Sequence, residues 1–422
     1  MEAHILKMQG ASEEKAEPSA EASEDASKDG IKAALAKNTM AYIDGIAPGK
    51  LGNVLLTGAT GFLGIHMLRH LLEHETGNIL CLVRKGKSSS VEKRLKTMLV
   101  YYFDQSYDEA FESGRLTVVN GDITDRDTVL ALRDVQMDMV INCAACVKHF
   151  AADDILERVN VTGVKNLIEL CENTQTRLIQ ISTVSVAGED VNYALPAHTV
   201  MYENMLYFGQ DLSNQYVHSK FAAEQAVLNE VAAGKLDAKI IRVGNLMSRN
   251  SDGEFQANAV TSGFMRNLRG YATIGAYPVD EMARPVEFSP IDTVAEAVCL
   301  LAGTPKQYTV FHAVNGHWIE MGDLIAAMNA EGLAVEITDR KAFERRLREA
   351  MADEKQNMLV SGLISYLSSD SGSVRRYVPE NHTFTKNALY RLGFRWPLTD
   401  ENYLRNVIRA LVTFGFFDAD NA

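Results

Sequence analysis

The sequence predicts an α/β protein with a doubly wound parallel sheet and, behind it, a smaller and mainly helical domain. From residue 53 onward, short β-branched runs alternate with longer runs of helical periodicity, which is the pattern of parallel strands joined by crossover helices. From residue 249 onward, helical periodicity continues with few strand-like runs. Because 422 residues exceed one usual domain, we expect a large domain over residues 31–248 and a smaller one over residues 249–422.

The start of the chain has the composition of a linker. Residues 11–30 hold no large apolar residue and many Ala, Glu and Ser, so they offer little surface to bury. We therefore expect residues 1–30 to form a disordered acidic linker and folded structure to resume near Ile31. A chain that begins with a linker is expected to be a piece of a larger protein.

Residues 53–64, NVLLTGATGFLG, combine a strand, a glycine turn and the start of a helix. The apolar run at residues 54–56 ends in a turn with three glycines, and the first N–H groups of the following helix face the end of the strand. Gly58 can adopt a positive φ, Gly61 lets backbone approach a pyrophosphate, and Gly64 lets helix and strand pack closely. The motif predicts a Rossmann-type dinucleotide site, with an ordinary glycine turn as the alternative.

The residues after the second predicted strand indicate which dinucleotide binds. An NAD-specific site would have Asp or Glu at the end of the strand at residues 78–83, but this chain has Arg84 and Lys85. A cationic pair suits a 2′-phosphate, so we predict NADPH as the cofactor, with Arg94 as a further charge. The alternative is that residues 84–96 form only a solvated basic surface.

Further apolar runs complete the predicted sheet, and the loops after them contribute to the cofactor site, because ligands bind at the carboxyl ends of parallel strands. Asp122, followed by Ile123, is predicted to accept a hydrogen bond from the adenine amino group. Ala144 and Ala145 are small enough for the cofactor backbone to pass. The runs are residues 116–120, 139–142, 178–182 and 239–243, and residues 308–314 predict a strand that returns to the sheet.

Candidate catalytic side chains follow the fifth strand. Thr183 lies at its carboxyl end, and Tyr216 and Lys220 are four residues apart, on one face of a predicted helix. A tyrosine titrates near pH 10, about three units too high for acid or base work at neutrality, and a neighbouring ammonium would lower its pKa. The alternative is a chance Tyr-x-x-x-Lys on a helix surface.

The net charge, the apolar stretches and the cysteines of the sequence indicate which partners and which cellular location to expect. A net charge of −13 argues against nucleic acid, and the absence of a long uncharged apolar stretch argues against a membrane span or signal peptide. The five cysteines lie within apolar runs, which favours reduced thiols in a cytoplasmic protein. Cys143 and Cys146 form C-x-x-C, but no second Cys/His pair follows at metal-ligand spacing, so a redox or zinc role is only an alternative.

The chain from residue 53 onward resembles the thioester reductase domains that end nonribosomal peptide and polyketide synthetases and carboxylic acid reductases, within the extended short-chain dehydrogenase/reductase superfamily. The most specific match is residues 203–224, ENMLYFGQDLSNQYVHSKFAAE. Further matches are CLVR from Cys81, STVSV from Ser182, RVGNLMSRNSDG from Arg242 and FSPIDTVAEAV from Phe288. The family more often has Pro where Val243 stands.

The resemblance implies a reaction and roles for the residues. An acyl or peptidyl thioester would arrive on the phosphopantetheine arm of a carrier protein, and NADPH would deliver hydride to give an aldehyde, or an alcohol after a second hydride. Thr183 and Tyr216 would hydrogen-bond the carbonyl oxygen, and Lys220 would bind the nicotinamide ribose and lower the pKa of Tyr216. Further cofactor contacts implied by the resemblance are Thr57, Thr60, Phe62, Leu63, Asn160, Gly244 and Asn245.

Residues 339–348, DRKAFERRLR, concentrate positive charge within the predicted second domain. They are interpreted either as a solvated helix face or as a docking patch for an acidic carrier protein. We expect a monomeric domain that acts within a larger synthetase.

Three other functions stay open. A nucleotide-sugar epimerase or dehydratase of the same superfamily shares the glycine turn and the Tyr/Lys pair, but recycles bound NAD and has no need of Arg84. A non-catalytic NADP-binding regulator would not need the Tyr/Lys pair. A free-standing fatty acyl-CoA reductase is the third alternative.

Overall fold

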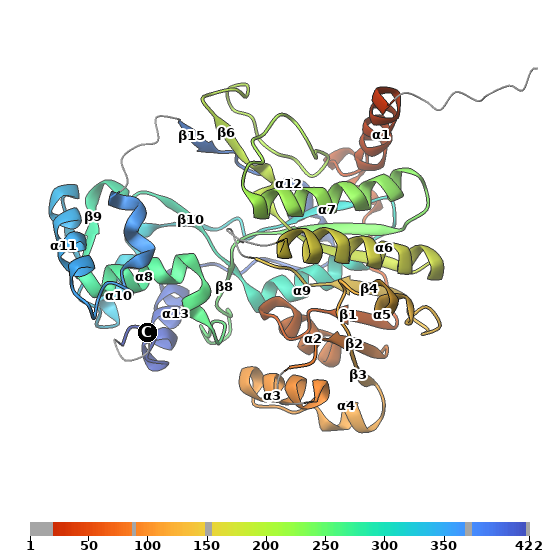
Figure 1. The fold of residues 1–422 in the computed structure, drawn as a ribbon, viewed down its shortest axis with the longest axis horizontal. Coiled ribbons are helices and arrows are strands. Elements are labelled where there is room, and N and C mark those ends of the chain that lie inside the picture. Colours follow the sequence, from red (N-terminus) through yellow and green to blue (C-terminus); the bar gives the residue numbers. More distant parts are fainter. Residues whose placement is uncertain (1–19, 87–89, 148–153, 368–373, 419–422) are drawn as a thin grey trace, which may run out of the picture.

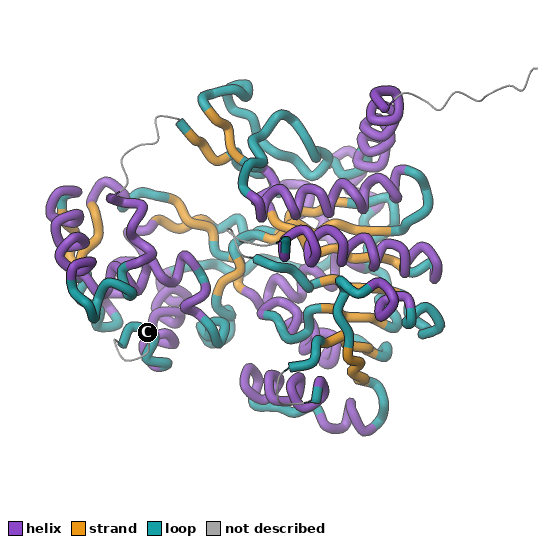
Figure 2. The backbone as a smooth tube through the Cα atoms, in the orientation of Figure 1, coloured by secondary structure: helices purple, strands orange, loops and turns teal. Residues whose placement is uncertain are grey.

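The computed structural model describes residues 20–86, 90–147, 154–367 and 374–418, with side chains from residue 28 onward. Within these ranges, a parallel sheet of seven strands has the order β12-β7-β5-β4-β1-β2-β3 (Figures 1 and 2). The order reverses between β1 and β4, so the prediction of a doubly wound sheet is confirmed. The strands are β1 (Val54–Thr57), β2 (Ile79–Val83), β3 (Leu116–Asn120), β4 (Met139–Asn142), β5 (Arg177–Thr183), β7 (Ala238–Val243) and β12 (Val310–Ala313).

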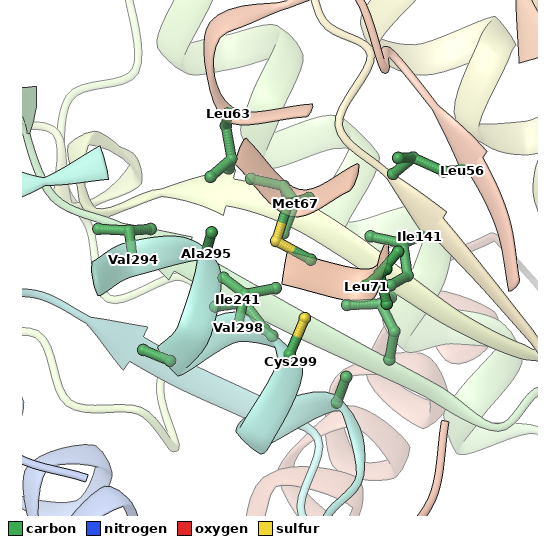
Figure 3. Close-up of a cluster of buried hydrophobic side chains, with 14 of the residues drawn as sticks. Leu56, Leu63, Met67, Leu71, Ile141, Ile241, Val294, Ala295, Val298 and Cys299 are labelled. Carbon is green, nitrogen blue, oxygen red and sulfur yellow. The ribbon is translucent and has the colours of Figure 1, made fainter. Parts of the chain in front are cut away.

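Helices cover both faces of the sheet, which explains why its strands are continuous apolar runs. Figure 3 shows one face, where Leu71 of α2 lies beside Ile141 of β4 and Val298 of α9 lies beside Ile241 of β7. This face is covered by α2 (Phe62–His74), α3 (Val91–Phe103), α9 (Ile291–Ala302) and α12 (Thr383–Arg391). The other face is covered by α1 (Ala20–Leu35), α5 (Arg126–Leu130), α6 (Gly163–Thr174) and α7 (Gln215–Ala232).

The linker prediction is wrong for residues 20–30, because they belong to helix α1. Ala, Glu and Lys are good helix formers, so a composition that lacks large apolar residues still suits a helix. Ile31 and Leu35, one turn apart at its end, are buried beside α7 and supply the tertiary contact that a short helix needs. Residues 1–19 of the predicted linker lie outside the described residues.

A second hydrophobic core lies beyond the carboxyl end of β7 (Figure 1). It is mainly helical, as predicted, and two short two-stranded sheets complete it. Its helices are α8 (Gly263–Ile274), α10 (Met321–Ala330), α11 (Arg340–Ala352) and α13 (Glu401–Thr413). Its strands are β9 (Ala276–Pro278) with β14 (Glu336–Thr338), and β10 (Pro285–Glu287) with β13 (Trp318–Glu320).

The chain passes between the two cores repeatedly. The strand predicted at residues 308–314 is β12, which pairs in parallel with β7 at the edge of the sheet. Helices α9 and α12 also pack on the sheet, although their periodicity did not distinguish them from helices of the second domain. Amphipathic spacing identifies an apolar face but not the surface that covers it.

Two small additions connect these parts. Strand β6 (Glu189–Val191) pairs antiparallel with β15 (Arg375–Tyr377), above the start of α7 (Figure 2). Strand β8 (Leu246–Met247) pairs in parallel with β11 (Ser289–Pro290), where the chain leaves the sheet for the second core.

A further short helix in the described part of the first domain is α4 (Asp108–Glu112). Across the described ranges, no helix has the length and apolar character needed to cross a membrane.

Candidate active site

A cleft of about 240 Å³ lies at the carboxyl ends of β1 to β4. It brings together most of the predicted cofactor residues from separate loops, as the strand order requires. Those that line it are Gly58, Thr60, Gly61, Arg84, Arg94, Asp122, Ile123, Ala144 and Ala145. Sequence reasoning missed Leu82, Val83, Gly121, Cys143 and Val159, most of which are direct neighbours of predicted residues.

The glycine turn forms the floor of the cleft. Gly58 has a φ of +73°, and a Cβ there would lie 2.5 Å from the Ala144 nitrogen, so only glycine fits. A Cβ on Gly64 would lie 2.0 Å from the Gly58 oxygen, which explains the close packing of helix on turn. Gly61 is the N-cap of α2 and provides no side-chain cap. The first N–H groups of α2 therefore remain available to an anion in the cleft.

Other residues of the same motif serve the protein core. The Thr57 hydroxyl donates to Asn142 Oδ1 over 2.6 Å. The Phe62 ring contacts the His66 and Tyr102 rings, and Leu63 is buried beneath the helix. The side chains of Thr57, Phe62 and Leu63 thus do not line the cleft, because the inward face of α2 is needed for packing.

Positive charge gathers where β2 ends. Arg84 is largely exposed and its Nη1 lies 3.7 Å from Asp122 Oδ2. Arg94 Nη1 donates to the Arg84 carbonyl over 2.8 Å, so α3 supports the backbone of the arginine that faces the cleft. The Lys85 N–H donates to Asn120 Oδ1, and Lys85 is not among the residues that line the cleft.

The predicted catalytic hydroxyls lie together. Thr183 ends β5, and Tyr216 stands in the first turn of α7, whose N-cap Asn214 accepts from the N–H groups of Tyr216 and Val217. The Tyr216 and Thr183 hydroxyl groups share a hydrogen bond. Thr183 Oγ1 also lies 3.0 Å from Ser185 Oγ, to which it donates.

Burial raises the pKa of Tyr216 to about 12; Cys146 adds to this effect and the Thr183 hydrogen bond opposes it. Lys220 Nζ donates to the Ile181 carbonyl of β5 over 2.7 Å. That Lys220 lowers the pKa of Tyr216 stays a prediction. Burial lowers the pKa of Lys220 to about 8, against the opposing effect of the Glu224 carboxylate.

Asn160 is a clamp between loops and does not line the cleft. It lies in the π-helical turn η2 (Glu157–Thr162), where each backbone hydrogen bond spans one more residue than in an α-helix. Its amide donates to the Cys146 carbonyl and to Ser219 Oγ, both over 2.9 Å, and its oxygen accepts from the Cys146 N–H. Asn160 thus joins the loop after β4 to the helical turn between Tyr216 and Lys220.

Gly244 and Asn245 follow β7 and lie outside the cleft as well. Thr183 is the sheet partner of Val243, so these two residues adjoin the carboxyl end of β5. The Asn245 N–H donates to the carboxyl group of Glu287, a residue of β10.

A buried ion pair behind the site was missed by sequence reasoning. Arg242 Nη2 lies 2.7 Å from Glu224 Oε2, and both side chains are fully buried. Glu224 also accepts from Ser182 Oγ, next to Thr183, and Arg242 donates to the Met205 carbonyl in the segment before α7. The only sequence signal was Glu224 standing one helical turn after Lys220.

Residues 203–214, the first part of the segment 203–224 that carries the most specific resemblance, hold the chain in place before α7. Buried Glu203 accepts from the N–H and hydroxyl of Thr385 on α12. Gln210 Nε2 donates to the Val186 and Leu206 carbonyls. These contacts fix the path of the chain into Tyr216.

Neither alternative for the Cys143–Cys146 pair gains support. Both residues are free thiols, and burial raises the pKa of Cys143 to about 12, far from a reactive thiolate. Among the described side chains, no group of His, Cys, Asp and Glu is arranged to hold a metal ion.

The doubly wound sheet, its phosphate-accepting turn and the hydroxyl pair beside it define an NAD(P)-dependent oxidoreductase. The family described as "Male sterility protein" matches residues 56–298. A thiolation-reductase di-domain from an archaeal non-ribosomal peptide synthetase is 39% identical, with a TM-score of 0.83 over 92% of this chain and 81% of that chain. The chain therefore belongs to the Male sterility protein family and, within it, to the reductase domains of nonribosomal peptide synthetases.

Other similar proteins are also reductases or peptide synthetases. The reductase domain of the aureusimine biosynthetic cluster is 26% identical, with a TM-score of 0.75 over 95% of this chain and all of that one. A linear gramicidin synthase of Brevibacillus parabrevis is 25% identical over 86% of this chain, and the carboxylic acid reductase of Mycobacterium tuberculosis is 27% identical over 62%. The chain spans only 7% of the gramicidin synthase and 24% of the carboxylic acid reductase.

Proposed function

We propose that the protein reduces an acyl or peptidyl thioester, held on the phosphopantetheine arm of a carrier protein, and releases it as an aldehyde with NADPH as reductant. The observation that carries this proposal is the hydrogen-bonded pair of Thr183 and Tyr216 at the same sheet edge as a phosphate-accepting cleft. The similarity to synthetase reductase domains supports the thioester as substrate. A second reduction would give the alcohol.

The cleft fits a phosphorylated dinucleotide. A Cβ on Gly58 would fill the cradle, and the uncapped start of α2 offers N–H groups to the pyrophosphate. Arg84 and Arg94 line the cleft after β2, and their positive charge supports NADPH over NADH as the cofactor. NADPH held there would supply a hydride to the thioester carbonyl carbon.

The protein's own groups act on the carbonyl oxygen. With a pKa near 12, Tyr216 keeps its proton at neutral pH and can donate it as negative charge develops on that oxygen. The Thr183 hydroxyl donates to Ser185 Oγ in this structure, and by turning toward the substrate it would be a second donor to the same oxygen. In a buried site such hydrogen bonds are strong. Lys220, fixed on the Ile181 carbonyl, places an ammonium beside the site and is available to the nicotinamide ribose.

The partner would be a carrier protein, received in part by the second core. Much of the basic run on α11 is neutralised within the fold: Arg340 pairs with Asp280, Arg346 with Glu336 and Arg348 with Glu344. Lys341 and Arg345 have no such ion pair among the described residues and are the cations that we assign to docking. We further propose a monomer in the reducing cytosol, where the free cysteines would persist.

The test is to incubate the purified protein with NADPH and a panel of acyl-pantetheine thioesters, and to follow products by mass spectrometry and thiol release by colorimetry. We expect aldehyde or alcohol to form in step with free thiol, and much less product with NADH. If NADPH binds but no thiol is released from any member of the panel or from a carrier-bound thioester, the proposed function is wrong and the non-catalytic alternative gains support.

A further inference from the structure

A buried carboxyl group fastens the turn that follows β7. The Asn245 N–H donates to Glu287 Oε2 over 2.6 Å, and the Asn245 side-chain amide donates to the Glu287 carbonyl over 3.3 Å. The Ser289 N–H donates in turn to the Asn245 carbonyl over 2.9 Å. Because Val243 is the sheet partner of Thr183, this turn lies directly beside the proposed catalytic hydroxyl.

Gly244 provides the space that the carboxyl group occupies. A Cβ at this position would lie 2.6 Å from Glu287 Oε2, a distance at which the carboxyl group has to move. Gly244 has no positive φ, so the glycine is required by this contact and not by its backbone conformation. Gly244 and Glu287 therefore form a complementary pair across the two cores.

The Glu287 carboxyl group acts as a hydrogen-bonding group more than as a charge. It is 3% exposed, Ser289 Oγ donates to its Oε1, and the Asn245 N–H donates to its Oε2. Burial, with a smaller contribution from Glu380, raises its pKa to about 8 against the opposing effect of these hydrogen bonds. The other titratable groups that face it are Tyr377 and Tyr403, whose pKa values it helps to raise.

The second core holds Glu287 in place. Glu287 ends β10, which pairs antiparallel with β13 in the register Glu287–Trp318. The neighbouring Phe288 is 2% exposed and packs in the second core together with Ile319 of β13. The position of the carboxyl group is thus set by a rigid element outside the sheet.

We propose that Glu287 is a positioning residue of the reductase, which acts through Gly244 and Asn245 to hold the turn beside Thr183 in register with the reacting carbonyl. This assigns a catalytic contribution to the second core besides substrate reception. The proposal rests on the proposed function, since Thr183 needs a fixed neighbour only if a carbonyl is aligned there.

The experiment compares Glu287→Ala and Glu287→Gln with a matched control, Asn329→Ala. The Asn329 side chain, which is exposed, also holds backbone in place, at Val335, but within the second core. Glu287→Ala leaves a buried N–H unsatisfied, so we expect kcat to fall about tenfold or more, with KM for NADPH changed less than about twofold. Glu287→Gln is expected to recover most of this loss, because its amide oxygen accepts from Asn245. Asn329→Ala is expected to lower Tm with little change in kcat.

A second variant, at Gly244, disturbs the same contact between Gly244 and the Glu287 carboxyl group. Gly244→Ala displaces the carboxyl group without removing it, and its loss in kcat is expected not to add to that of Glu287→Ala, because both break one contact. The proposal is overturned if Glu287→Ala lowers kcat no more than Asn329→Ala does, if Gln is as damaging as Ala, or if the two losses add fully.

Hydrogen exchange separates this proposal from the proposed function. Glu287→Ala is expected to speed exchange of the Asn245 amide about tenfold, with Gln close to wild type, whether or not any thioester is reduced. If the wild-type protein reduces no thioester, the proposed function fails, and unchanged exchange at Asn245 in Glu287→Ala would independently show that Glu287 does not hold the turn.

Discussion

The candidate cofactor cleft and the second core both contribute residues at the carboxyl ends of the strands, but they do so in different ways. In the cleft, the functional side chains stand directly after the strands that position them: Arg84 after β2, Asp122 after β3 and Ala144 after β4. In the second core, Glu287 reaches a turn that is 42 residues away in the sequence. The cleft is therefore a product of local sequence and strand order, whereas the contribution of the second core exists only once the two cores have packed.

The largest effect is expected where the two regions meet, at Thr183 and Tyr216, the pair that we propose to be catalytic. Tyr216→Phe removes the proton donor, so kcat should fall about a hundredfold or more while the affinity for NADPH stays close to wild type. Tyr101→Phe, at an exposed position on α3, is the control that should leave the rate unchanged. If Tyr216→Phe turns over near the wild-type rate, Tyr216 is not the proton donor. The reaction would then take place elsewhere, and the comparison of the two regions would no longer apply.

The cleft itself is tested by its floor. Gly58→Ala should weaken NADPH binding more than about tenfold, because the new methyl group meets the backbone of Ala144 and because φ is positive. Gly114→Ala is a matched control: its φ is +75°, but no atom lies within 4 Å of the added Cβ. Titration of the two variants with NADPH separates steric exclusion from backbone strain, and equal weakening in both would show that the cradle does not matter.

A smaller effect is expected at the outer end of the cleft. Arg84→Ala should raise KM for NADPH about tenfold and leave KM for NADH nearly unchanged, since only the former carries the 2′-phosphate. Lys85→Ala is the control, because Lys85 does not line the cleft. Steady-state kinetics with both cofactors decide the matter, and a parallel loss with NADPH and NADH would assign Arg84 a purely structural role.

The smallest effect concerns the outer surface of the second core. Arg345→Glu should slow reduction of an acyl group on its carrier protein a few fold, in a salt-dependent way, and leave a free pantetheine thioester unaffected. Arg346 is a poor choice for this test, because it also donates to the Gly275 carbonyl over 2.8 Å and pairs with Glu336. If Arg345→Glu lowers the reduction rates of both substrates equally, this face of α11 has a structural role and does not bind the carrier protein.

Sequence patterns predicted the strands, the glycine turn and the arginine at the cleft, because each depends on residues within one strand and its loop. They failed where tertiary burial decides. Burial of the phenol raises the pKa of Tyr216, and Lys220 donates to the Ile181 carbonyl of β5; the four-residue spacing encodes neither fact. Helix α1 was mistaken for linker because its stability depends on the surface of α7.

Long-range pairs were beyond sequence patterns for the same reason. Glu224 and Arg242 lie on different elements, and no local motif indicates that each would be the partner of the other. Asn160 was assigned to the cofactor by resemblance, but in the fold its amide is used to clamp the Cys146 backbone. Buried polar groups take whichever partners the packed chain brings near, so their roles follow from the structure and not from the motif.

The repeated passage of the chain between the two cores has a consequence for recombination among such enzymes. The second core is assembled from three stretches, around residues 247–288, 319–367 and 403–416, with α9, β12 and α12 returning to the sheet between them. A single crossover near residue 249 would therefore exchange part of the sheet's own cover together with the second core. A chimaera that transplants the whole second core needs three grafts, and the first graft has to keep Gly244 and Glu287 from the same parent.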